Sequence, residues 1–393
     1  MKRNHHTFYT LTTLLTSITL LFTACGEADN TPRSAVEYTQ ISESYPAPQN
    51  NRSEDSSAAD SFSAAFSSES PSGITSTDST GSSTMTSDLT VTFAELHGSL
   101  SVSGNQLMDQ NGDPIQLYGM STHGIGWFPQ YVNNDAFRTL KDDWNTNCIR
   151  LSLYTDEYNG YSTGGNQEDL KSLIKNGIDY ATDLGMYVIV DWHVLQDQDP
   201  NVHKEDALRF FEEISSLYGD HTNILYEICN EPNGYATWDS VKSYANEVIP
   251  VIRENDGDAV ILVGTPTWSQ DIDKAAEAPL EFDNVMYTLH FYAATHADDL
   301  RSRLESCVNG GLPVFISEFG MCDASGNGAN DFDQAGKWID LIDDYNISFI
   351  CWNLANKAET SSVLKSDCDK ISDWTDEDLS ESGRWIREQF RSH

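Results

Sequence analysis

The chain has 393 residues, with 23 lysines and arginines against 61 aspartates and glutamates, so its formal net charge at pH 7 is −38. Nucleic acids and anionic membrane surfaces are bound by clustered basic residues, so an acidic chain of this kind argues against both partners. The seven cysteines lack the Cys-x-x-Cys spacing of a zinc site. Hydrophobic residues make up 39% of the chain, enough for a sizeable core. Uncharged partners remain compatible with this composition.

Residues 1–25 have the pattern of an export signal. Two basic residues near the start precede a short apolar segment over 11–22, which ends in Phe22-Thr23-Ala24-Cys25-Gly26. This ending resembles a bacterial lipobox, in which the cysteine becomes the lipid-modified first residue. We therefore expect export to the cell surface, with Cys25 as the lipid attachment site and this lipid as the only membrane contact. An ordinary secretory signal, with release from the cell, is the alternative.

Residues 26–92 are predicted to form a disordered linker. Serine and threonine are abundant here, and the few large apolar residues are scattered without a period. Such a segment cannot bury enough apolar surface to offset the entropy lost when its backbone is ordered. We expect it to tether the lipid anchor to a single catalytic domain over 93–393.

The folded domain is predicted to begin with a short β-hairpin around Ser103-Gly104-Asn105. Beyond it, apolar runs typical of buried strands alternate with amphipathic helical patterns. The strands are predicted at 115–119, 148–153, 187–191, 224–228, 259–263, 285–289, 314–317 and 349–352, and the clearest helices at 169–184, 204–218, 238–254 and 335–345. Such an alternation is typical of an α/β fold of the (β/α)8 TIM barrel type. A doubly wound sheet is the runner-up, but Gly124-Ile125-Gly126 lacks the third glycine of a dinucleotide-binding loop.

Polar and aromatic residues lie at or near the carboxyl ends of successive predicted strands. In a barrel these ends converge on one face, where active sites are built. A single strand-end histidine or glutamate is usually structural, but their recurrence along the chain indicates a shared site. The polar residues are His123, Arg150, His193, Asn230, Glu231, His290, Tyr292 and Glu318, and the aromatic ones are Trp127, Tyr154, Trp268 and Trp352.

Two glutamates in this set suggest hydrolysis of a glycosidic bond. That reaction needs one carboxyl group to protonate the leaving oxygen and a second carboxylate facing the anomeric carbon. Glu318 is the better nucleophile, because a nearby arginine and tyrosine would keep it ionised, and Glu231 is the better acid/base. The strand-end aromatic residues would provide flat platforms for sugar rings, with core packing as the alternative. Core packing is the interpretation for Trp144 and Trp338, which lie within helical patterns.

The complete set of motifs resembles glycoside hydrolase family 5, and most of all its bacterial cellulase branch, subfamily 2. The motifs are Gly119-Met120-Ser121-Thr122-His123-Gly124, Ile149-Arg150-Leu151, Asp191-Trp192-His193, Asn230-Glu231-Pro232, His290-Phe291-Tyr292, Ser317-Glu318-Phe319-Gly320 and Trp352-Asn353-Leu354. The resemblance extends from residue 96 to the C-terminus and implies a (β/α)8 barrel, retaining hydrolysis of β-1,4-glucans and no cofactor. We also expect a monomer without a metal ion.

The resemblance also implies roles for individual residues, beginning with the same two catalytic roles for the glutamates. It makes Trp127 a distal sugar platform, Trp268 a platform on the leaving-group side, and Trp352 the floor under the reacting sugar. Lys357 and Glu359 match polar contacts to a glucose hydroxyl. The expected substrate-binding residues are His123, Trp127, Arg150, Tyr154, His193, Asn230, Trp268, His290, Tyr292, His296, Trp352, Lys357 and Glu359.

Two alternatives to an endo-β-1,4-glucanase (cellulase) remain at this point. Another β-glycanase on the same scaffold, such as a mannanase, mixed-linkage glucanase or xyloglucanase, would keep both glutamates and differ only in its sugar contacts. A non-catalytic glycan-binding lipoprotein would keep the aromatic residues and lose a carboxylate. Glu231 and Glu318 both lie in intact motifs, which argues against that second alternative.

Overall fold

The computed structural model describes residues 91–393. The predicted signal peptide over 1–25, the lipid site Cys25, and all but the last two residues of the linker predicted over 26–92 lie outside the described residues. The first described element is α1 (Phe93–His97), which begins with a capping box between Thr92 and Glu95. The boundary between linker and catalytic domain stays a prediction.

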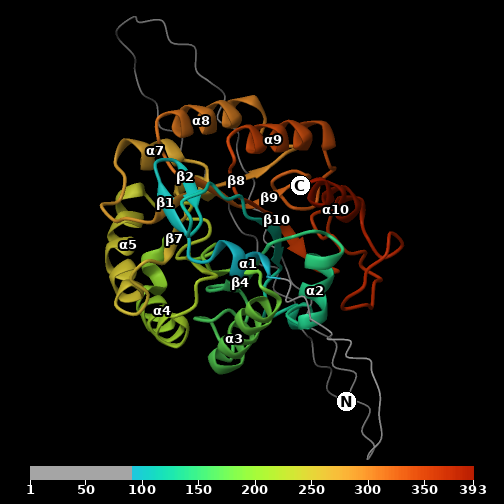
Figure 1. Cartoon of the computed structure of the whole chain (residues 1–393), viewed down its shortest axis with the longest axis horizontal. Helices are drawn as coiled ribbons and strands as arrows, with labels where there is room; N and C mark the ends of the chain where they lie inside the picture. The colour runs from blue at the N-terminus through green and yellow to red at the C-terminus, as the bar shows by residue number, and fades with distance from the viewer. Residues whose placement is uncertain (1–90) are drawn as a thin grey trace, which may run out of the picture. The chain divides into compact units, whose positions relative to one another are not determined.

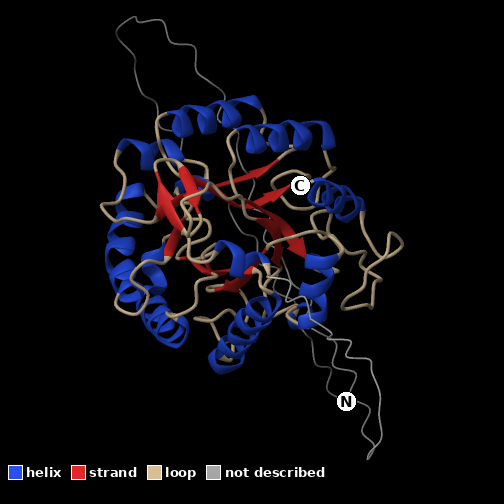
Figure 2. Cartoon of the chain, in the orientation of Figure 1, coloured by secondary structure: helices blue, strands red, loops and turns tan. Residues whose placement is uncertain are grey.

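Eight parallel strands close into a barrel surrounded by helices, as Figures 1 and 2 show. The ring closes where β10 pairs with β3, with Phe349 opposite Tyr118. The predicted (β/α)8 barrel is therefore confirmed, and the doubly wound sheet is excluded. The strands are β3 (Tyr118–Thr122), β4 (Cys148–Tyr154), β5 (Tyr187–His193), β6 (Ile224–Glu227), β7 (Val260–Val263), β8 (Val285–Tyr292), β9 (Val314–Gly320) and β10 (Phe349–Leu354).

The helices pack on the outside of the barrel because each long one has an apolar face. In α3, for example, Ile174, Ile178 and Ala181 are buried one turn apart. Trp338 of α9 is fully buried, as is Trp144 just after α2, so core packing is correct for both. The helices are α2 (Asn134–Asp142), α3 (Gln167–Leu184), α4 (Lys204–Tyr218), α5 (Trp238–Arg253), α6 (Pro266–Ser269), α7 (Ile272–Glu277), α8 (Asp298–Asn309), α9 (Phe332–Asp344) and α10 (Glu381–Ser392), with short 3-10 turns at η1 (Pro129–Tyr131) and η2 (Pro200–His203).

The barrel interior changes from apolar to polar along its axis. Alternate residues of a strand share one face, so Leu225 and Glu227 of β6 both point inwards, as do Cys148 and Arg150 of β4. The first residue of each pair belongs to an apolar cluster at the amino-terminal end of the barrel. The second lies closer to the carboxyl end, where the candidate site is found.

The predicted hairpin is present and covers the apolar end of the barrel. Strands β1 (Ser101–Ser103) and β2 (Gln106–Met108) pair antiparallel, with Val102 opposite Leu107. Leu107 packs in the same apolar cluster as Ile115 and Leu117. These last two residues were expected in the first barrel strand, but they lie just before β3 and contribute to this cover.

The six cysteines of the described part of the chain are all buried and unpaired. Export permits a disulfide among Cys307, Cys322 and Cys368, but these three side chains are buried and free, like the cysteines on the strands. Over residues 91–393, no helix combines the length and the apolar character needed to cross a bilayer.

Candidate active site

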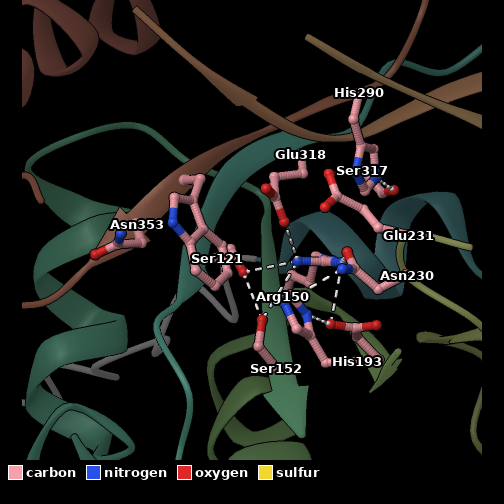
Figure 3. Close-up of polar contacts among 12 residues, drawn as sticks. Ser121, Arg150, Ser152, His193, Asn230, Glu231, His290, Ser317, Glu318 and Asn353 are labelled. Atoms are coloured by element: carbon pink, nitrogen blue, oxygen red, sulfur yellow. Dashed lines mark hydrogen bonds and ion pairs between the residues drawn. The ribbon is translucent and has the colours of Figure 1, made fainter. Parts of the chain in front are cut away.

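The carboxyl ends of the strands bring the predicted polar residues together on one face of the barrel. Figure 3 shows Arg150 at the centre of this group, with Glu318, Asn230 and His193 around it. Nearly all of these side chains are buried, and Glu318 is only 4% exposed. By element, Arg150 and Tyr154 lie on β4, His193 on β5, His290 and Tyr292 on β8, Glu318 on β9 and Trp352 on β10, while His123 follows β3 and Asn230 and Glu231 follow β6.

Glu231 and Glu318 face one another beside His290. One oxygen of each glutamate and one ring nitrogen of His290 lie within 4.8 Å of one another. Inverting glycosidases separate their carboxyl groups by about 6.5–9.5 Å to admit a water, whereas retaining ones need about 5–5.5 Å. The bound of 4.8 Å on these two oxygens is closer to the retaining separation than to the inverting one. It favours direct attack by one carboxylate.

The same three side chains are the one group among residues 91–393 that could reach a single metal ion. Both nitrogens of His290 already have partners, however, at 2.9 Å to Glu231 Oε1 and 2.8 Å to Ser317 Oγ. A histidine hydrogen-bonded on both sides to a carboxyl and a hydroxyl group is suited to proton transfer. We therefore interpret the group as acid/base machinery.

Glu318 has the two contacts expected for a nucleophile. The Tyr292 hydroxyl donates to Oε1 at 2.8 Å, and Arg150 Nη1 donates to Oε2 at 3.4 Å. Burial and the charge of Glu231 raise the pKa of Glu318, and the positive charges of His290 and Arg150 only partly oppose the rise. The contacts are therefore as expected, but the pKa lies above the usual value of a glutamate, because desolvation outweighs them.

Arg150 is fully buried and connects five strands or strand ends. Its Nε donates to Glu227 Oε2 at 2.7 Å, and its Nη2 donates to Asn230 Oδ1 at 2.6 Å and contacts Asp191 Oδ2 at 3.0 Å. A buried guanidinium is tolerated only when its donors have partners, and here each nitrogen has one. The cation consequently fixes the positions of the polar residues around it.

His193 is a neutral ring that orients Asn230. An amide nitrogen can only donate, so the 3.2 Å contact from Asn230 Nδ2 makes Nε2 of His193 the acceptor. Its Nδ1 then carries the hydrogen and donates to Asp191 Oδ2 at 2.6 Å. Burial and the charge of Arg150 lower the pKa of His193 to about 3, in agreement with a neutral ring. Nδ2 of Asn230 also donates to the carbonyl of Val194 at 3.2 Å, so both of its hydrogens have acceptors.

Aromatic rings line one side of the site. His193 stacks on Trp352 with ring centroids 5.3 Å apart, and Tyr154 lies 4.0 Å from His193. The ring centroid of Trp127 lies 4.5 Å from that of Tyr154, and Nε1 of Trp127 donates to the carbonyl of Tyr158. Trp352 and Tyr154 are almost completely buried, whereas Trp127 is partly exposed at the rim.

Lys357 and Glu359 lie together in the loop after β10. Lys357 Nζ contacts Glu359 Oε2 at 2.6 Å and His123 Nε2 at 3.4 Å. Asn353 Nδ2 donates to the other oxygen of Glu359 at 3.0 Å. Burial, and then the Lys357 charge, lower the pKa of His123 well below its ordinary range, so this ring is neutral. The expected polar pair is therefore present beside His123.

Trp268 lies in the short, irregular α6 after β7, and His296 lies in the loop after β8. Thr267, Trp268 and Ser269 have φ values of 59°, 52° and 53°, which are unfavourable for residues with a Cβ. The Ser269 hydroxyl donates to the carbonyl of Asn230 at 2.6 Å, and the Trp268 amide donates to that of Pro232 at 3.1 Å, so the strained turn is tied to the segment around Glu231. His296 Nδ1 accepts from the Tyr292 amide, and burial lowers its pKa to about 4.

Five buried polar residues that contact Arg150 or His290 have no role predicted from the sequence. They are Ser121, Ser152, Asp191, Glu227 and Ser317, and none has exposed surface. The signal that would have found Glu227 is a single acid inside an otherwise apolar run, two residues after inward-facing Leu225. A charge on the inner face of a barrel strand needs a partner, and Arg150 is the cation that supplies it.

Known protein families show to which class a barrel with these paired glutamates belongs. The model of the family "cellulase (glycosyl hydrolase family 5)" matches residues 108–358. The chain belongs to this family. The resemblance drawn from the motifs is thereby confirmed, and the protein is a glycoside hydrolase of the cellulase type.

Similar proteins point to the same class. Endoglucanase A of Butyrivibrio fibrisolvens is 51% identical over 297 residues, which are 75% of this chain and 69% of that one. An endoglucanase of Clostridium saccharobutylicum is 47% identical over 294 residues, 75% of this chain and 65% of that one. The chain thus spans about two thirds of the length of these relatives. A solved catalytic domain of a Thermobifida fusca endoglucanase, in complex with cellotetraose, has a TM-score of 0.73 at 40% identity and covers 76% of this chain and 99% of that one.

Proposed function

We propose that this protein is a retaining endo-β-1,4-glucanase that cleaves cellulose and related β-glucans. The observation that carries the mechanism is the short separation of Glu231 and Glu318, whose nearest oxygens lie within 4.8 Å. The substrate class is supported by relatives named endoglucanases at 47–51% identity and by the bound cellotetraose of a similar solved domain.

In the first step of the proposed reaction, Glu318 attacks the anomeric carbon. Its two oxygens are positioned by Tyr292 and Arg150, whose hydrogen bonds favour the ionised form. Glu231 gives its proton to the glycosidic oxygen as the bond to the leaving sugar breaks. The products of the step are a shortened glucan and a sugar bound covalently to Glu318.

In the second step, water releases the sugar from Glu318. Esterification has removed the negative charge of Glu318 that favoured a protonated Glu231, so Glu231, hydrogen-bonded to His290, remains a carboxylate after it has given up its proton and can take a proton from the water. The water attacks the anomeric carbon, and the bond to Glu318 breaks. Two inversions restore the β configuration, and both glutamates return to their starting states.

The surrounding residues are proposed to bind the sugar rings on either side of this centre. Trp352 and Tyr154 are placed under the reacting sugar and Trp127 at the distal rim, with Trp268 on the leaving-group side. Aromatic rings suit glucose because its two faces carry mainly C–H groups. The polar contacts would come from His123, His193, Asn230, His296, Lys357 and Glu359.

A panel of polysaccharides tests the substrate assignment. We expect purified enzyme to act on carboxymethylcellulose and barley β-glucan, with a rapid fall in viscosity and with oligosaccharide products, and to act weakly on xyloglucan, mannan and xylan. Glu318→Gln, prepared in parallel, should be inactive on all five and so assign the activity to this site. Activity on mannan alone would contradict the cellulase assignment, and slow viscosity loss with a single small product would contradict endo action.

A further inference from the structure

A buried chain of hydrogen bonds connects Glu227 to Glu231 through two other side chains. Ser317 Oγ lies 2.7 Å from Glu227 Oε1 and 2.8 Å from Nε2 of His290. The other ring nitrogen of His290 lies 2.9 Å from Glu231 Oε1. Figure 3 shows the last three members of this chain, Ser317, His290 and Glu231, side by side. Glu227 and Ser317 have no exposed surface, so neither can touch a substrate directly.

The number of available protons determines the direction of each hydrogen bond. Glu227 is ionised, because although burial raises its pKa, the Arg150 guanidinium with its Nε at 2.7 Å lowers that pKa to about 2. An ionised carboxylate can only accept, so Ser317 donates its single hydrogen to Glu227. The oxygen of Ser317 then has only lone pairs left for His290. Nε2 of His290 must therefore carry a hydrogen.

We propose that Glu227 and Ser317 are positioning residues for the acid/base step: they hold a proton on Nε2 of His290 and leave Nδ1 to face Glu231. This inference rests on the proposed role of Glu231 as acid/base. It extends the catalytic machinery to two residues that act only through His290.

The consequence for Glu231 follows from the state of Nδ1. When the ring is an imidazolium, Nδ1 donates to Glu231 Oε1, so the proton that Glu231 delivers must be carried on its other oxygen. After delivery, the carboxylate that forms on Glu231 is stabilised by the adjacent cation. The imidazolium of His290 thus lowers the free-energy cost of forming a buried carboxylate on Glu231 while the leaving sugar is still bound.

The groups that face His290 favour this imidazolium. The acids around His290 are Glu227 of β6, Glu231 just after β6, Glu318 of β9 and Asp191 of β5. Arg150 of β4 is the cation among these acids. Burial alone would lower the pKa of His290, but the hydrogen bonds to Glu227 and Glu231 and the nearby acids raise it to about 9. The ring should therefore stay charged at neutral pH.

Nitrogen-15 NMR of histidine-labelled full-chain enzyme tests the proton position without measuring activity. The His290 signals are identified by their loss in His290→Gln. We expect a protonated Nε2 at every pH at which the enzyme is folded, and a ring titration near pH 9. Ser317→Ala and Glu227→Gln should each lower that midpoint by about one pH unit or more, because each removes a group that stabilises the charged ring.

Two further variants separate this role from general disruption of the barrel. Ser152→Ala removes another buried hydroxyl, one that contacts Arg150 and Ser121, and should leave the His290 titration unchanged. Ser317→Thr keeps the hydroxyl and should restore the midpoint. If Glu227→Gln does not fold, Ser317→Ala and Ser317→Thr still test whether the Ser317 hydroxyl raises the midpoint of the His290 titration. A wild-type ring protonated only on Nδ1, or an unchanged titration in Ser317→Ala, would overturn the proposal.

Kinetics with two leaving groups provide a second readout. Ser317→Ala should lose about tenfold or more in kcat/KM on cellotetraose, which needs protonation, and less than about twofold on 2,4-dinitrophenyl β-cellobioside, which does not. Equal losses on both would mean a purely structural role for Ser317 and would contradict the proposal. If wild-type enzyme cleaves neither substrate, the proposed function fails, whereas the NMR experiment still determines where the His290 proton lies.

Discussion

Glu231 and Glu318 are the same type of side chain placed in different surroundings. Glu318 receives hydrogen bonds from a tyrosine and an arginine, whereas Glu231 faces the ring of a histidine. Burial and the charge of Glu231 raise the pKa of Glu318, against the influence of His290 and Arg150. The pH at which Glu318 becomes a nucleophile therefore depends on which hydrogen bonds it keeps.

Removing one of those hydrogen bonds should move the pH profile. Tyr292→Phe should lower kcat/KM on cellotetraose by roughly 10–150-fold, the equivalent of about 1.5–3 kcal/mol for a hydrogen bond to a charged group. Wild-type activity is lost as pH falls through the raised pKa of Glu318. Loss of the donor destabilises the ionised form and raises that pKa further, so the acid limb should move to higher pH. The measurement is kcat/KM as a function of pH.

A second tyrosine on the same strand provides the control for this change. The Tyr287 hydroxyl accepts from the Leu280 amide at 2.8 Å, outside the site. Tyr287→Phe should therefore leave the acid limb where it is. If Tyr292→Phe also leaves it unmoved, Glu318 is not the group whose ionisation the acid limb reports.

At the scale of residues, the sequence predicts what lies at strand ends better than what lies inside strands. Glu231 and Glu318 stand out because each lies just beyond the end of a predicted apolar strand. Glu227 and Ser317 do not, because a polar residue inside a strand points into the barrel only if the register is known. Asp191 appeared within a motif, yet only the structure shows it between Arg150 and His193.

At the scale of elements, the hairpin β1–β2 and the segment before β3 seal the end of the barrel opposite the site. Leu107, Ile115 and Leu117 are buried there with the first inward-facing residues of the strands. This apolar layer lies beneath the polar network, in which the buried charges of Arg150 and Glu227 are tolerated because they are paired and hydrogen-bonded.

Truncation of the hairpin core should therefore cost stability. Leu107 is 2% exposed, and Leu107→Ala should lower the free energy of unfolding by about 2–5 kcal/mol, the usual range for a buried leucine. Urea unfolding followed by tryptophan fluorescence measures the loss. Leu217→Ala on α4, where the side chain is 55% exposed, should change stability by no more than about 0.5 kcal/mol. Similar losses in both variants would mean that the hairpin does not seal the barrel.

The strands themselves could be predicted in number and order but not at their carboxyl ends. β5, β8 and β9 each continue two or three residues beyond the predicted end, through His193, Tyr292 and Gly320. Polar residues after an apolar run have the composition of a loop, yet these are hydrogen-bonded to neighbouring strands within the mouth of the barrel. A local sequence pattern does not reveal pairing between strands that are far apart in the chain.

At the scale of the whole molecule, we propose a monomeric exported enzyme that is held at the cell surface by a lipid on Cys25, with residues 26–92 as the tether. The lipobox-like ending at Cys25 and the serine- and threonine-rich segment after it support this arrangement. Mass spectrometry of the mature N-terminus should find a diacylated Cys25, because a single chain binds membranes only reversibly. Cys25→Ser should release the enzyme into the medium. Cleavage at any other position would contradict the anchor and leave export intact.

The most direct test of the central claim, covalent attack by Glu318, is the configuration of the first product. Proton NMR of cellotetraose hydrolysis, recorded in the first minutes before mutarotation, distinguishes the α and β anomers. We expect the β anomer from wild type. In Glu318→Ala, added azide should replace the missing nucleophile on an activated aryl cellobioside and give an α-glycosyl azide. Initial α product from the wild-type enzyme would mean inversion through a water, and would contradict both the role of Glu318 and the carboxyl separation on which it is based.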